Sequence, residues 1–66
     1  MNGNKIDINE VGNYEITITK CGLLSLVCIV YPHINLLVYE VRTSNEKIFE
    51  TYVLRDAIQK YNEFAE

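Results

Sequence analysis

The stretch that decides the fold runs from Leu23 to Val41 and reads LLSLVCIVYPHINLLVYEV. Its length nearly suits a membrane-spanning helix. However, its centre holds the polar sequence PHIN at 32–35, and Glu40 lies near its end. A proline followed by polar residues is typical of a turn and poorly suited to hydrocarbon. We therefore predict two buried strands joined by a short turn around 31–33, and no membrane association.

The first of these two strands is apolar on both faces. Residues 23–31 contain a single clearly polar side chain, that of Ser25. Such strands are central and covered on both sides. One side should pack against a helix. A sheet of this size has no second layer for the other side, so we expect a partner chain to cover it.

The flanking segments predict further strands. Residues 13–20 alternate between apolar and polar side chains, the period of a half-buried strand, and Gly22 then supplies a turn. A strand over 34–43 is followed by a polar turn in which Asn45 tolerates a left-handed conformation, and a short strand returns over 47–51. Connections this short require antiparallel pairing.

From about Tyr52 the apolar period becomes helical. The apolar positions are Leu54, Ala57, Ile58, Tyr61, Phe64 and Ala65. We predict a helix over 52–65, with Thr51 as its N-cap and an ion pair between Asp56 and Lys60. A helix of this length is marginal alone in water, so it should pack on the sheet.

These elements predict an α+β fold, a single antiparallel β-meander of three to four strands with one C-terminal amphipathic helix packed on one face. The 66 residues suffice for one domain. We divide it into a polar lead-in over 1–12 with a short strand at 6–8, the meander over 13–51 and the helix over 52–65.

The charge pattern disfavours direct nucleic-acid binding. The formal net charge is −3, and acidic and basic residues alternate, so no basic run is available to neutralise phosphates. A nucleic-acid interface would require a cluster of the scattered cations. These are Lys5, Lys20, Arg42, Lys47, Arg55 and Lys60.

We expect no enzyme activity, cofactor or metal. Cys21, Cys28 and His33 are fewer than the four ligands of a structural zinc site. His33 is the single histidine and follows a proline in a predicted turn, and the three glycines are too isolated to form a phosphate-binding loop. Two cysteines are also too few for a secreted disulfide scaffold, so we expect free thiols and a cytoplasmic location.

Five tyrosines in so short a chain indicate a protein interface as an alternative to a purely structural role. If Tyr31 and Tyr39 line one open face of the sheet, that face is the binding surface, with nearby carboxylates offering negative charge to a basic partner. The candidate partner-binding residues are Tyr31, Leu37, Tyr39, Glu40, Val41, Glu46, Glu50 and Asp56.

In size, acidity and layout the chain resembles small accessory proteins of phages and mobile elements. The resemblance implies an anti-defence inhibitor that occludes a host or defence enzyme, such as a basic nucleic-acid-handling enzyme. We therefore predict a small acidic, non-enzymatic protein-binding module. The alternatives are a homodimer or other homo-oligomer that pairs sheet to sheet or edge to edge, and a small nucleic-acid-binding domain, which the charge favours least.

Overall fold

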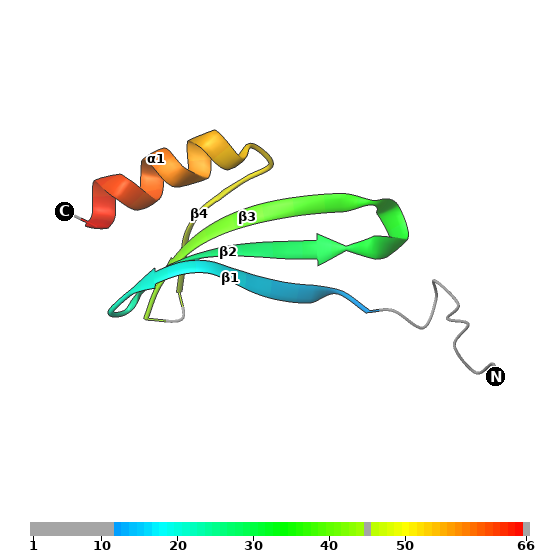
Figure 1. Cartoon of the computed structure of the whole chain (residues 1–66), viewed down its shortest axis with the longest axis horizontal. Helices are drawn as coiled ribbons and strands as arrows, with labels where there is room; N and C mark the ends of the chain where they lie inside the picture. The colour runs from blue at the N-terminus through cyan, green and yellow to red at the C-terminus, as the bar shows by residue number, and fades with distance from the viewer. Residues whose placement is uncertain (1–11, 45, 66) are drawn as a thin grey trace.

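The chain folds as a four-stranded antiparallel sheet followed by one helix (Figure 1). The computed structural model describes residues 12–44 and 46–65. The elements are β1 (Tyr14–Cys21), β2 (Leu24–Tyr31), the 3-10 turn η2 (Pro32–Ile34), β3 (Leu36–Thr43), β4 (Glu46–Thr51) and α1 (Leu54–Ala65). The strands neighbour one another in chain order. The predicted α+β meander is confirmed, and the strand predicted at 6–8 lies outside the described residues.

Three left-handed residues shape the connections between strands. Gly22, with φ of 61°, turns the chain from β1 to β2, as predicted. Asn35 follows η2 with φ of 54°, and Ser44 follows β3 with φ of 52°. The N–H of Ser44 donates to the carbonyl of Leu23 over 3.2 Å, which joins the two turns at this end of the sheet. The left-handed conformation expected of Asn45 lies outside the described residues.

The helix begins two residues later than predicted. Its first turn is closed by the N–H of Ala57, which donates to the carbonyl of Val53 over 3.1 Å. The hydroxyl of Thr51 instead accepts a hydrogen bond from the N–H of Val53 over 3.1 Å. Thr51 therefore shapes the bend that leads into the helix, and the prediction that it is the N-cap is wrong.

Lys60 has different partners from the predicted one. Its ammonium group pairs with Glu63 over 3.3 Å. It also lies 5.3 Å from the centre of the Phe49 ring on β4, within the range of a cation–π contact. The structure shows no ion pair between Lys60 and Asp56, so that prediction is wrong.

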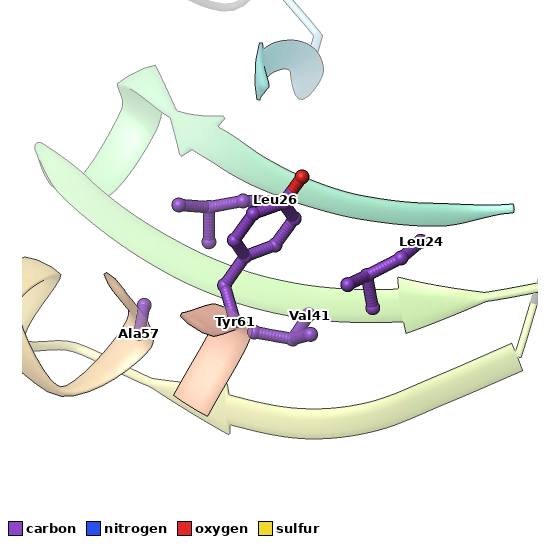
Figure 2. Close-up of a cluster of buried hydrophobic side chains, with 5 residues drawn as sticks. All are labelled: Leu24, Leu26, Val41, Ala57 and Tyr61. Carbon is purple, nitrogen blue, oxygen red and sulfur yellow. The ribbon is translucent and has the colours of Figure 1, made fainter. Parts of the chain in front are cut away.

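The main core lies between the helix and the sheet. Leu26 and Val41 are almost completely buried there, and Ala57 and Tyr61 of α1 pack against them. Figure 2 shows Leu24 and Leu26 on either side of the Tyr61 ring. Tyr39, Ile48 and Phe49 are partly buried against the same cluster.

A second cluster lies on the sheet face away from the helix. Val27, Ile29 and Val38 are only 3%, 8% and 3% exposed, and Tyr31 and Leu36 pack against them. The chain therefore covers this face itself. The reason for expecting a partner chain on this face therefore does not hold, because large neighbouring side chains replace the missing layer.

As predicted, the stretch from Leu23 to Val41 contains two strands joined by a short turn, which are β2, η2 and most of β3. Within residues 12–44 and 46–65, no helix has both the length and the apolar character needed to span a membrane.

Candidate interaction surface

The helix covers only part of the sheet face on which it packs. α1 contacts β2, β3 and β4, and its two buried side chains, Ala57 and Tyr61, lie over Leu24, Leu26 and Val41. This is the half of the sheet next to the β1–β2 turn. Figure 1 shows that the β2–β3 hairpin continues beyond the N-terminal end of the helix. The face of this second half carries no helix.

Two rows of cross-strand partners form the exposed half. In antiparallel sheets, side chains that lie directly opposite each other point to the same face. The rows are on the helix side because Cys28 and Tyr39 lie two positions along from Leu26 and Val41 of the main core. The first row contains Tyr14, Val30 and Leu37, and the second contains Ile16, Cys28 and Tyr39. We call these six residues the uncovered rows.

The uncovered rows are apolar, and their members other than the buried Cys28 and the partly buried Val30 and Tyr39 are about half exposed. Tyr14, Ile16 and Leu37 are 49%, 50% and 46% exposed, and none of the six residues is an acid, a lysine or an arginine. Thr51 of β4 lies opposite Tyr39 and extends the second row. The chain then continues through Tyr52 and Val53, which are also exposed. Exposed apolar side chains are therefore found on β1, on β3 and in the segment between β4 and α1.

The opposite face is polar toward the β1–β2 turn and is organised around Arg42. Its Nη1 and Nη2 donate to the two carboxylate oxygens of Glu15 over 2.8 and 3.2 Å. Its Nε donates to Oε1 of Glu40 over 2.8 Å. Arg42 lies opposite Ser25 and Glu15 lies opposite Ile29, so the bridge between them crosses the intervening Val27. The ion pairs therefore help to cover the second cluster.

These contacts change the acidity of the groups involved. The hydrogen bond and charge of Arg42 hold the pKa of the Glu15 carboxyl below its ordinary value. The hydrogen bond to Glu15 raises the pKa of Arg42, and Glu40 adds to that effect. On β4, Lys47 donates to Glu50 over 2.9 Å, and this hydrogen bond raises the pKa of Lys47. The cations of this face are thus held largely by its own carboxylates.

The eight predicted partner-binding residues do not form one surface. Leu37, Tyr39 and Val41 share the helix side, but Val41 is 0% exposed and cannot touch a partner. Tyr31 and Glu40 point to the opposite face, so the hypothesis that Tyr31 and Tyr39 line one face is wrong. The three remaining residues are spread over β4 and the helix. They are Glu46 at the start of β4, Glu50 opposite Glu40, and Asp56 in the first turn of α1.

The prediction omitted Tyr14, Ile16, Cys28 and Val30, which the structure places in the uncovered rows. The sizes of the helix and the strands contain the information from which the uncovered half of the face could have been predicted. A helix of 12 residues is about 18 Å long and about 10 Å wide. β1, β2 and β3 have eight residues each and are about 26 Å long, and the sheet of four strands is more than about 14 Å wide. One such helix cannot cover the whole face.

The potentially reactive side chains lie apart from one another. His33 is exposed in η2, whereas Cys21 is exposed at the opposite end of the sheet and Cys28 is buried. Both thiols are free. In the described part of the chain, no three His, Cys, Asp or Glu side chains are grouped so that they could hold a metal ion.

An open hollow of about 210 Å³ lies on the polar face, next to the β1–β2 turn. Lys20, Ser25, Arg42 and Ser44 are among the residues that line it. Its volume is below the usual range of about 300–1,000 Å³ for ligand pockets. The guanidinium group of Arg42 is already occupied by two carboxylates. The uncovered rows are therefore the stronger candidate site.

Comparison of the chain with protein-family models, with curated proteins and with solved structures gives no match.

Proposed function

We propose that the chain is a non-enzymatic protein-binding module that docks another protein on the uncovered rows. The observation that supports this is the incomplete cover of the helix-side face, which leaves Tyr14, Ile16 and Leu37 about half exposed in a surface without formal charge. A contiguous exposed apolar surface is typical of a binding site. Tyrosine is also enriched at the centres of protein interfaces.

The partner in this proposal is a protein with a complementary apolar surface. Glu40 and Glu50 form ion pairs with Arg42 and Lys47, so the proposal does not depend on these carboxylates binding a basic partner. An inhibitor that occludes a host or defence enzyme, as the resemblance to phage accessory proteins implies, would use the uncovered rows as its contact surface.

Nucleic-acid binding has weaker support. Lys20, Arg42 and Lys47 lie in one row on the polar face, with Ser25 between Lys20 and Arg42. Arg42 and Lys47 each contact a carboxylate. Phosphate binding would have to displace those carboxylates, and the net charge of −3 opposes it.

A matched pair of leucine substitutions tests the proposal. Leu37, 46% exposed, is in the uncovered rows, whereas Leu23, 71% exposed, lies in the β1–β2 turn, outside them. Immobilised wild type, L37D and L23D are compared for proteins captured from a lysate of the source organism, after circular dichroism has shown that all three are folded. We expect one stoichiometric partner that wild type and L23D retain and that L37D binds at least tenfold more weakly.

Two results would overturn the proposal. One is a partner that L37D retains as well as wild type does, since the contact would then lie elsewhere. The other is the absence of any stoichiometric partner for wild type, with or without chemical crosslinking.

A further inference from the structure

β1 forms an accessible edge of the sheet. It has a strand neighbour, β2, on one side only, and all eight of its residues are exposed. Edge strands present unpaired backbone N–H and C=O groups that can pair with another strand. Nothing in the described part of the chain pairs with the outer side of β1.

A bulge in the middle of β1 makes its facing pattern symmetric. The register with β2 shifts between Thr17 and Thr19. Before the shift, Tyr14 and Ile16 point to the helix side. After it, Thr19 and Cys21 do so, because they lie opposite Leu26 and Leu24 of the main core. The order of facing is therefore the same from both ends of β1. The first and third residues from each end point to the helix side, and the second residue from each end points to the polar side.

We propose that β1 pairs antiparallel with β1 of a second copy, about a two-fold axis between Thr17 and Ile18. Residues opposite each other in a sheet must point to the same face. This register satisfies that condition for the pairs it forms outside the bulge. The pairs are Tyr14 with Cys21, Glu15 with Lys20, and Ile16 with Thr19 of the second copy. A shift of one residue would set helix-side residues opposite polar-side ones.

Charge complementarity supports a second copy as the occupant. The group formed by Glu15, Arg42 and Glu40 contains two carboxylates and one guanidinium, so its net charge is −1. Lys20 takes part in none of the ion pairs seen within residues 12–44 and 46–65. In the proposed register, Lys20 of the second copy lies opposite Glu15 and supplies the balancing charge, and symmetry repeats this contact.

Lysines and bulges usually protect sheet edges from pairing. In β1 both are placed so that a two-fold axis accommodates them, because the two bulges meet at the axis and each lysine meets a glutamate. The interface is isologous, as in most homodimers. The dimer then has one sheet of eight strands, with both helices on the same face. Along the sheet, the uncovered rows of each copy are followed by the helix-covered half of the other copy.

Sedimentation measures the pairing directly. K20E would set two carboxylates opposite each other at both ends of the interface. R55E makes the same change of charge on the exposed helix surface, away from β1. We expect wild type and R55E to form dimers at micromolar concentration, and the dimer dissociation constant of K20E to be at least tenfold higher at low salt.

Disulfide trapping tests the register. In a C28A background, Y14C places a thiol opposite Cys21 of the second copy. Within one chain these positions are seven residues apart on one strand, about 23 Å, which is too far for a disulfide. We expect Y14C to form a covalent dimer on mild oxidation. L37C, which is as exposed but lies on β3, should crosslink no more than the C28A parent.

The outcomes separate this proposal from the preceding one. A wild type that stays monomeric up to about 500 μM overturns the pairing, and so does a dimer in which Y14C crosslinks no faster than L37C. Neither result affects docking on the uncovered rows, which L37D tests. Conversely, a dimer whose captured partner is insensitive to L37D leaves the β1 pairing intact and overturns only the docking proposal.

Discussion

At the scale of single residues, Arg42 has the largest set of side-chain hydrogen bonds among residues 12–44 and 46–65. Its guanidinium joins Glu15 on β1 to Glu40 on its own strand. The Glu40 side chain is only 10% exposed, and a buried carboxylate is stable only with a partner of this kind. The bridge also crosses Val27 of β2. Arg42 on β3 thus connects to β1 across β2, and its side chain covers part of the sheet face that no second layer covers.

The lowered pKa of Glu15 predicts a loss of stability in acid. Because this pKa lies below its ordinary value of 4.5 in the folded protein, the contribution is present at higher pH and is lost as the pH falls through the folded-state value. E15Q removes the titrating group. We expect the melting temperature of E15Q to fall less steeply than that of wild type below about pH 4.5.

E63Q is the matched control for this measurement. Glu63 is as exposed as Glu15, at 54%, but makes a single contact with Lys60 over 3.3 Å. The prediction would be contradicted if melting curves recorded from neutral pH to about pH 2 showed the same acid dependence for E15Q and wild type.

At the scale of elements, α1 is attached to the sheet by few side chains. Ala57 and Tyr61 are its only buried residues within 54–65, whereas Leu54, Ile58 and Phe64 are between 41% and 55% exposed. The apolar stripe of the helix is therefore wider than its contact with the sheet. Periodicity predicted the stripe correctly, but it did not show which part of the stripe the sheet would contact.

Two helix substitutions distinguish the anchor from the exposed flank. Y61A removes a ring that packs between Leu24 and Leu26, and we expect the free energy of unfolding to fall by about 3 kcal/mol. I58A removes a side chain that is 42% exposed, and we expect a loss below about 1 kcal/mol. Urea unfolding followed by circular dichroism measures both. Equal losses would mean that Ile58 also packs on the sheet.

At the scale of the whole molecule, the sequence determined the order and type of the elements. The period-two segments, the turn at Pro32 and the change of period near Tyr52 were sufficient, because each is a local signal. The arrangement of the surfaces was not predictable in the same way. It depends on the bulge in β1, on the hydrogen bonds between Arg42 and Glu15 across β2, and on the position of the helix on the sheet. None of these features produces a periodic pattern in the sequence.

Hydrogen exchange should show that amide protection is highest in the central strands and lower in the helix. β2 and β3 are hydrogen-bonded on both sides, so we expect their amides to exchange at the rate set by global unfolding. Amides of α1 should exchange faster, because two buried side chains hold it to the sheet. Exchange measured by mass spectrometry on fragments checks this order. Slower exchange in α1 than in β2 would contradict it.

Each strand of the sheet pairs only with the strands that come directly before and after it in the chain. The strand pairs therefore join segments that are close in the chain, and such local pairing is associated with faster folding than pairing of distant segments. The β2–β3 hairpin involves only residues 24–43, so it can form before α1 docks. We expect folding to start at this hairpin and to end when the helix docks on it.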